Sequence, residues 1–496
     1  MQLQWNSRSC TYLQQTLAQV YHQEQTQEVR LPEQMPDISR ILCAWGQPVL
    51  RSKQWRTDGV LLTGGITAWV LYLPEEGAKP ESMEVWIPFQ SRCDTAGGDQ
   101  EGVIRACCCL RELDARMLSA RKMMIRTTVS LMCESLQQTT VQVVSPPEDT
   151  GAVQLLRRHY PMQLRKEAGE KLFLVQEELP ISGPAPKKIL ACEARCNVTE
   201  QSALGGKAVF RGQCRIHLVY LSEDERLISE ECELPFAQFT DLDADYDKEA
   251  TAQVMMALSS LETELLEGHI HIKCGIMAQY VIFDRCLIEV AEDAFSTETV
   301  LQTDSETLFL QGILEHARQP VEVSTNIPIP AVNMVDLTYW PDHPVVYREG
   351  DMAVAELPGC MQLIYYDENN VLRAEKYSCC SRTELPADAT CRVDVVVWPD
   401  QQPVCHMTGE GTRLRCSCTA ERITTAEHTI PMLTQLNPGE PILQDPDRPA
   451  LVLRRPGGES LWELARHYGS SVEAIRAANG LESEPAPDRM ILIPIP

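Results

Sequence analysis

The segment GQCRIHLVYL, residues 212–221, alternates with a period of two. Cys214, Ile216, Leu218 and Tyr220 stand at every second position, and most residues between them are polar. Alternate side chains of a β-strand face the same side of a sheet. The segment therefore predicts a half-buried strand.

The same pattern occurs earlier in the chain. The segment GGITAWVLYL aligns with GQCRIHLVYL without a gap, with Gly64 on Gly212 and Tyr72 on Tyr220, at an offset of 148 residues (212 minus 64). The segment LPEQMPDISRIL, which begins at Leu31, aligns with LPISGPAPKKIL at the same offset. Self-similarity at a fixed period indicates that one structural unit is used more than once.

A third, fainter copy follows at nearly the same spacing. Pro328 lies 148 residues beyond Pro180 (328 minus 180), but Pro358 stands where the other copies have glycine, so we expect distortion in that strand. The Pro/Gly-rich segment NPGEPILQDPDRP is typical of a linker. The repeat and the linker together predict units at residues 1–148, 149–296 and 297–444, followed by a C-terminal module at residues 445–496.

Each copy is predicted to be rich in β-structure. The polar loops PEEGAKP (residues 74–80) and SEDER (residues 222–226) separate consecutive strand-like segments, as in β-hairpins. Residues 249–267 are an exception, because their apolar side chains keep helical spacing and predict a short helix. The predicted fold class is mainly β (α+β).

Charge and composition bear on the partners and the location of the protein. The 496 residues include 44 Lys plus Arg and 70 Asp plus Glu, which gives a formal net charge of −26 and disfavours nucleic acid or anionic membrane as a partner. The first residues lack the pattern of a secretory signal, and no long apolar stretch predicts a transmembrane helix. We therefore expect a cytosolic protein.

The 20 cysteines have no C-x-x-C spacing, so they predict neither a zinc ribbon nor a thioredoxin-type site. In the repeat, Cys214 aligns with Ile66 and Cys232 aligns with Val85. Cysteines at apolar positions are typical of buried thiols in a reducing compartment.

The segment GGESLWELARHYGSSVEAIRAANG, residues 457–480, predicts two short helices. Two S-x-x-E motifs, which begin at Ser460 and Ser470, have the spacing of a helix capping box, and a glycine follows each helix. The apolar segments ALVLR (residues 450–454) and MILIPIP (residues 490–496) flank the pair. The predicted order is strand, helix, helix, strand.

This module resembles a LysM domain. The family pattern, a strand, G-D-T-L-W-x-I-A, a second helix ending in Asn, and L-x-I-P, is met by residues 458–465, Asn479 and residues 492–494, with Glu459 and Ser460 in place of Asp and Thr. In LysM domains, a groove between the first strand–helix loop and the second helix–strand loop binds N-acetylglucosamine chains. The resemblance implies a ligand- or partner-binding groove formed by Gly458, Glu459, Ser460, Asn479, Gly480 and Leu481.

The same residues also have purely structural explanations. Ser460 and Glu463 are explained by capping, Gly480 by helix termination, and Trp462 by packing in the core or at its rim. Whether these residues also contact a ligand stays open at the level of the sequence.

The complete architecture resembles the SPOCS-domain spore-coat proteins, and within them the SipL-type morphogenetic family, in which SPOCS repeats precede one LysM domain. The matching residues are Gly64, Tyr72, Pro88 and Phe89 in the first copy and Gly212, Tyr220, Pro235 and Phe236 in the second. The resemblance implies a non-enzymatic adapter, made in the mother-cell cytosol, that tethers the ATPase-built basement layer of the coat to the forespore surface. The alternative is a LysM protein that binds peptidoglycan in the cell wall or spore cortex.

The segments of the sequence that resemble catalytic or metal-binding motifs match those motifs incompletely. The segment LGGKA, residues 204–208, lacks the glycine spacing and hydroxyl of a phosphate-binding loop, and no cofactor is predicted. His269, His271 and Cys274 form the one metal-like cluster, with an ordinary exposed strand as the favoured interpretation. Residues 241–249 are acidic but lack the pattern of an EF-hand, so we interpret them as a solvated loop.

Overall fold

The computed structural model describes residues 5–75, 79–94, 102–148, 152–328, 333–350, 352–386, 388, 390–408, 411–443, 447–481 and 489–495. These residues form 22 β-strands and two α-helices, which confirms the predicted mainly β fold class. The predicted starts of the second unit and of the C-terminal module, at residues 149 and 445, lie outside the described residues, as does part of the first predicted hairpin loop.

Strands β1 to β6 form the first unit, which contains two three-stranded antiparallel sheets. Their strand orders are β2-β3-β4 and β1-β6-β5. The strands are β1 (Asn6–Arg30), β2 (Ile38–Arg56), β3 (Gly59–Pro74), β4 (Glu81–Asp94), β5 (Val103–Ser119) and β6 (Lys122–Ser145).

The second unit repeats this pairing with the strand orders β10-β9-β8 and β11-β12-β7. Its strands are β7 (Val153–Glu178), β8 (Pro186–Leu204), β9 (Lys207–Ser222), β10 (Leu227–Asp241), β11 (Thr251–Leu266) and β12 (His269–Ser296). In the third unit, β13-β20-β18 continue the β11-β12-β7 sheet through the contact of β13 with β7, which makes one seven-stranded sheet with β19 paired to β20, and β14, β15 and β17 pair with β16 in a second sheet. Its strands are β13 (Thr299–Ile327), β14 (Met334–Pro341), β15 (Val345–Glu349), β16 (Met352–Tyr366), β17 (Leu372–Leu385), β18 (Arg392–Pro399), β19 (Val404–Thr408) and β20 (Gly411–Pro441).

The helix predicted over residues 249–267 is wrong, because this segment forms strand β11. β11 pairs with β12 from Thr251↔Phe283 to Leu266↔His269. Its first half is buried on nearly every residue, since it lies in the interior of the molecule. A strand that is buried on both faces has a continuous apolar run, which periodicity alone does not distinguish from a buried helix.

The glycine and phenylalanine of the repeat motif face each other across the β3–β4 and β9–β10 ladders. Gly64 pairs with Phe89, and Gly212 pairs with Phe236. A Cβ atom at Gly212 would lie 2.0 Å from the backbone oxygen of Asn197 and 2.7 Å from Cζ of Phe236. The motif therefore has glycine because the aromatic ring and the neighbouring backbone fill the space of a side chain.

Pro358 replaces that glycine in the third unit, where the predicted distortion falls on the neighbouring strand. β16 itself continues through Pro358, but its partner on one side is divided into β14, which ends at Pro341, and β15, which begins at Val345. The backbone N–H of Asp342 donates to the carbonyl of Pro358 at 3.0 Å between the two strands. The third unit thus keeps β16 as a continuous strand, but the strand beside it is divided into β14 and β15.

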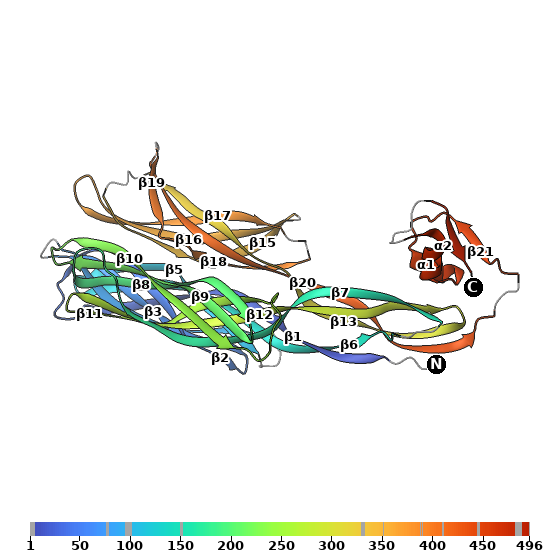
Figure 1. Cartoon of the computed structure of the whole chain (residues 1–496). Helices are drawn as coiled ribbons and strands as arrows, with labels where there is room; N and C mark the ends of the chain where they lie inside the picture. The colour runs from blue at the N-terminus through green and yellow to red at the C-terminus, as the bar shows by residue number, and fades with distance from the viewer. Residues whose placement is uncertain are drawn as a thin grey trace.

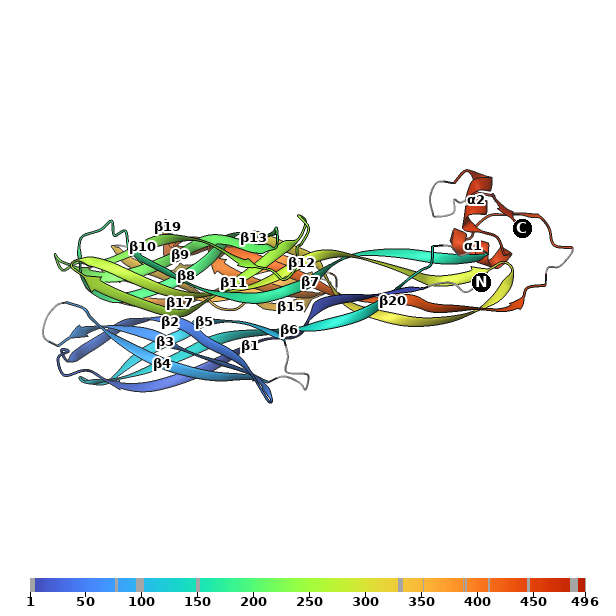
Figure 2. The same cartoon turned by 60° about the horizontal axis from the view of Figure 1, so that its bottom comes forward.

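A stalk made of three two-stranded ribbons extends from the three units (Figure 1 and Figure 2). The ribbons are the outer parts of the β1–β6, β7–β12 and β13–β20 pairs. They share one apolar core, which contains residues of all six strands: Cys10, Tyr12, Val143, Met162, Leu164, Ile288, Val290, Leu308, Leu310, Ile430 and Met432. Burial between ribbons therefore stabilises the stalk, because a two-stranded ribbon alone has no buried face.

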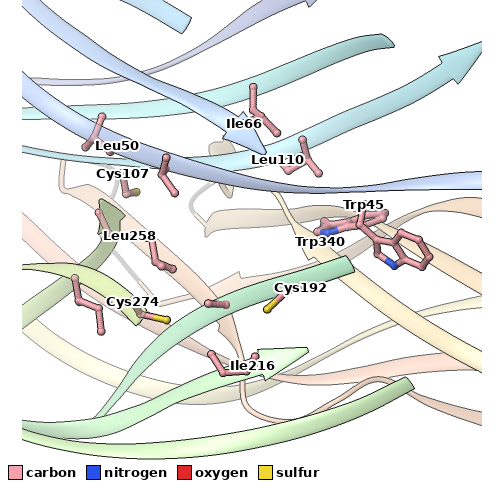
Figure 3. Packing of buried hydrophobic residues seen from close by; sticks show 14 of the residues in the cluster. Trp45, Leu50, Ile66, Cys107, Leu110, Cys192, Ile216, Leu258, Cys274 and Trp340 are labelled. Carbon is pink, nitrogen blue, oxygen red and sulfur yellow. The ribbon is translucent and has the colours of Figure 1, made fainter. Parts of the chain in front are cut away.

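The wide parts of the first and second units share one core, to which the third unit contributes Trp340, Ile364 and Leu372, while the third unit also has a core of its own. Figure 3 shows Trp45 of the first unit, Cys192 of the second and Trp340 of the third in a single cluster. All three side chains are at most 6% exposed. The units consequently pack as one body.

Candidate functional site

The C-terminal module lies at the far end of the stalk, away from the wide parts of the units (Figure 1). It consists of β21 (Leu451–Arg454), α1 (Leu461–Tyr468), α2 (Val472–Asn479) and β22 (Ile491–Pro494), which confirms the predicted order strand, helix, helix, strand. Its core contains buried residues of α1, α2 and β22 together with Phe295 of the stalk strand β12. Arg454 at the end of β21 pairs with Ile491 at the start of β22. Both predicted groove loops therefore leave the two-stranded sheet at the same end.

Helix α1 is capped as predicted. The Ser460 hydroxyl accepts a hydrogen bond from the backbone N–H of Glu463 at 3.2 Å, and the Glu463 carboxylate accepts from the Ser460 N–H at 2.7 Å. Gly469 ends the helix with φ 57°, in the left-handed region. This confirms the first capping box, which satisfies N–H groups that have no partner within the helix.

The predicted second capping box, at Ser470 and Glu473, is wrong by one residue. Ser471 is the N-cap of α2, and its hydroxyl accepts from the N–H of Ala474 at 3.0 Å. Ser470 is fully buried and donates its hydroxyl to the carbonyl of Pro494, the last residue of β22. The contact with Pro494 holds Ser470 in the interior of the module, one residue before the N-cap.

The first groove loop contains Gly458, Glu459 and Ser460. The Glu459 carboxylate accepts from the N–H of Gly457 at 2.7 Å and pairs with Arg454 of β21. The N–H of Gly457 and the charge of Arg454 lower the pKa of Glu459, so it is ionised at neutral pH. Within the described part of the chain, and apart from the neighbours of Gly458 in sequence, no atom lies within 4 Å of the position that its Cβ would occupy, so this loop presents open backbone beside a fixed carboxylate.

The side chain of Asn479, a residue predicted for the second groove loop, forms its hydrogen bonds within the module. Its Nδ2 donates to the carbonyls of Ile475 and Leu492 at 2.7 and 2.6 Å, and its Oδ1 accepts from the N–H of Leu492 at 2.7 Å. Gly480 caps α2 with φ 61°, and apart from its chain neighbours no described residue lies within 4 Å of the place of a Cβ there, whereas Leu481 packs on the core of the module. Asn479 thus fixes α2 to β22 and has little capacity left for a ligand.

Trp462 joins the module to the stalk, a contact that the sequence did not reveal. Its indole N–H donates to Oδ2 of Asp293 at 3.0 Å, and its ring lies edge-on to Phe295 with ring centroids 4.9 Å apart. Arg466 of α1 also pairs with Asp293. The register between β12 and β7 shifts between Ala291 and Asp293, as at a β-bulge, so the regular ladder is interrupted here. No local pattern could indicate a partner 169 residues away.

The other candidate clusters have structural roles. His269 and His271 are exposed on one face of β12, and Cys274 is buried on the other, so the three side chains do not converge. No group of three metal-ligating side chains occurs among the described residues. The segment LGGKA forms the β8–β9 turn, where Gly205 and Gly206 have φ values of 57° and 67°.

The cysteines are free thiols. Thirteen of the 20 are buried, six are half-buried, and only Cys380 is exposed. Burial raises the pKa of Cys232 to about 11, and the repeat places this cysteine in the apolar position of Val85. Most of the thiols are therefore packing groups, as predicted.

Comparison with protein families identifies two domains. Residues 186–280, within the second unit, match the family described as SipL, SPOCS domain, and residues 458–494 match the LysM domain family. The chain carries a SPOCS domain and a C-terminal LysM domain. This confirms the predicted resemblance to SipL-type proteins.

The two domain families indicate a sporulation-related protein with a LysM module, a type of module that binds peptidoglycan; both families are non-catalytic. No curated protein and no solved structure matches the chain. Among the described residues, no helix is long and apolar enough to span a membrane.

Proposed function

We propose that the protein is a non-enzymatic scaffold of spore-coat assembly, which tethers the basement layer of the coat to the forespore surface through protein contacts of its LysM and SPOCS domains. One observation carries the proposal: the LysM domain and the SPOCS-containing units lie at opposite ends of an elongated molecule (Figure 2). Two separated ends suit a protein that connects two layers. We place it in the mother-cell cytosol, where its free thiols would be kept reduced.

An apolar sheet face of the LysM domain supports protein recognition. Leu451 and Leu453 of β21 are 52% and 57% exposed, because Val452 between them faces the helices. They pair with Pro494 and Leu492 of β22, so four apolar residues share the outer face. A contiguous apolar face on a small domain is typical of a protein-binding surface. We propose that the basement-layer ATPase, the partner implied by the family resemblance, docks here.

Glycan binding is the second candidate. Gly458, Glu459, Ser460, Asn479, Gly480 and Leu481 would form its groove. The open space at Gly458 and Gly480 favours it, since a sugar chain could approach the backbone there. The internal hydrogen bonds of Asn479 count against it.

The full-length protein separates the two candidates in paired binding assays, with the purified basement-layer ATPase and with insoluble peptidoglycan. We expect saturable ATPase binding that a Leu451→Glu/Leu453→Glu variant weakens at least about tenfold, because each charge would be desolvated in the interface. A matched variant, Val300→Glu/Leu314→Glu, changes two similarly exposed residues of β13 and should bind normally. Strong retention on peptidoglycan without ATPase binding would contradict the scaffold proposal and support the glycan candidate.

A further inference from the structure

A cavity of about 580 Å³ lies between the first and third units. Strands β1, β5 and β6 line one side, and β15 and β18 line the other. Arg165 of β7 and Gln253 of β11 add side chains from the second unit. The cavity therefore exists only where all three units meet, and its volume is in the range of small-molecule sites.

The lining of this cavity is basic, although the whole chain has a net charge of −26. It contains two carboxylates, Glu134 and Asp394. Burial lowers the pKa of the lining residue His343 to about 4, so its imidazole is neutral at pH 7. The lining arginines outnumber the carboxylates, and they are Arg105, Arg111, Arg165, Arg348 and Arg392.

Arg165 is the most unusual of these cations, because among the described residues its hydrogen-bond acceptors are neutral, and the carboxylates Glu134 and Asp394 act on it only through space. It is 2% exposed. Its guanidinium donates to Oε1 of Gln311 at 3.2 Å and to Oγ1 of Thr425 at 3.1 Å, both of which are neutral. Burial lowers the pKa of Arg165 from its ordinary value, but an arginine stays protonated in a protein. A buried cation with only neutral partners is costly unless an anion comes close.

The nearby carboxylates are already engaged by other groups. Glu134 accepts from Nη1 of Arg105 at 2.8 Å and from Nε2 of Gln15 at 2.8 Å. Asp394 pairs through Oδ1 with Nε of Arg392 at 3.1 Å, and its Oδ2 is buried without a partner among the described residues. The Nε of Arg105 is likewise buried, and within the described part of the chain no group accepts from it. Arg111 is ion-paired with Asp342 at 2.9 Å. The guanidinium of Arg165 and the Nε of Arg105 therefore remain as positive charge and donor capacity in the cavity after the internal pairs are formed.

Access is provided at the outer part of the cavity. The side chains of Arg111 and Arg392 are 47% and 44% exposed, in contrast to 4% for Arg105. A ligand that enters would first meet exposed guanidinium groups and then buried ones. Arginine groups bind carboxylate and phosphate oxygens in paired, directional hydrogen bonds.

We propose that this cavity binds a small organic or inorganic anion that carries two or more carboxylate or phosphate groups. Such a ligand would neutralise Arg165 and connect side chains of all three units. It would therefore stabilise the relative arrangement of the units, because it binds only the assembled state. The site is separate from the LysM domain and independent of the scaffold proposal.

The test is calorimetric titration of the full-length protein with citrate and, separately, with inorganic pyrophosphate, at constant ionic strength and with sodium chloride as the blank. We expect saturable binding of at least one anion, and the two arms distinguish a carboxylate ligand from a phosphate ligand. Arg111→Ala and Arg392→Ala should each weaken binding about tenfold, since each removes a charged donor. Arg92→Ala is the matched control, because Arg92 is 48% exposed and ion-paired on β4, away from the cavity, and it should bind like the parent protein.

Two results would overturn the proposal. One is the absence of saturable binding of either anion up to about 10 mM, a concentration at which a millimolar Kd would be seen. The other is equal affinity in the Arg111→Ala/Arg392→Ala double variant and in Arg92→Ala. The melting temperature of the double variant without ligand shows whether it has a folding defect. If it does, the affinities of the single variants Arg111→Ala and Arg392→Ala decide the test.

Discussion

Replacement of Asp293 by alanine should weaken the docking of the LysM domain on the stalk. Oδ2 of Asp293 accepts from the indole N–H of Trp462 and pairs with Arg466, while its Oδ1 is held by the N–H of Ala294. A hydrogen bond to a charged group contributes about 1.5–3 kcal/mol. The Arg466 pair adds little, because its side chains are 55% and 31% exposed. The docking equilibrium should therefore fall roughly 10- to 150-fold.

The Trp462–Phe295 ring contact remains in this variant and contributes about 0.5–1.5 kcal/mol, so some docked population should persist. Small-angle scattering measures the change, since a detached LysM domain increases the radius of gyration. Limited proteolysis between residues 441 and 451 gives a second readout. Glu306→Ala, which removes an exposed acid from β13, is the control. Equal scattering and cleavage rates for the two variants would refute the docking contact.

Three further predictions concern the fold and the LysM domain. Gly212→Ala should lower the free energy of unfolding by about 1–3 kcal/mol in urea, because its Cβ would meet backbone, whereas Gly457→Ala should change it little. Asn479→Ala should destabilise the LysM domain by about 1–3 kcal/mol in hydrogen exchange and leave the three units unchanged; unaltered exchange in α2 would contradict its structural role. Burial alone would lower the pKa of His217, but its carboxylate partners raise it to about 10. The contribution of His217 to the free energy of unfolding should therefore be complete below about pH 6.5 and be lost as the pH rises through 10. The decline of the free energy of unfolding with pH should be less steep in His217→Gln.

Features that depend on neighbours in sequence could be predicted. The first LysM capping box and both terminating glycines follow from residues three or four positions apart. The strands of the repeat follow from alternation, and their pairing follows from the short loops between them. The displacement of the second cap to Ser471 could not be predicted, because it depends on the contact of Ser470 with Pro494 at the other end of the module.

The contacts between units were not predicted from the sequence, although one pattern in the sequence is related to them. Gln15, Gln163 and Gln311 recur at intervals of 148 residues (163 minus 15, 311 minus 163) in strands that otherwise turn apolar residues inward. In the structure the N–H of Gln15 donates to Oε1 of Gln311, and Gln163 pairs with Ile313 where β7 meets β13. A polar residue kept at the same position of each copy could have indicated that the copies meet there. The arginines of the cavity do not recur at this spacing, so no pattern in the sequence indicated the cavity.

Two buried carboxylates explain why the units form one body. Glu193 of the second unit accepts from the N–H of Gly46 in the first unit at 3.3 Å and from the indole of Trp340 in the third at 2.7 Å. Asp336 of the third unit accepts from the indole of Trp45 at 3.2 Å and from His217 of the second unit at 2.8 Å.

Glu193 is 2% exposed and Asp336 is 1% exposed. In a separated unit each carboxylate would lose the partners that the other units supply, and the apolar surface around it would be exposed. The repeated topology therefore does not imply interchangeable domains. The copies differ at the residues that join them, so each unit fits one position in the assembly.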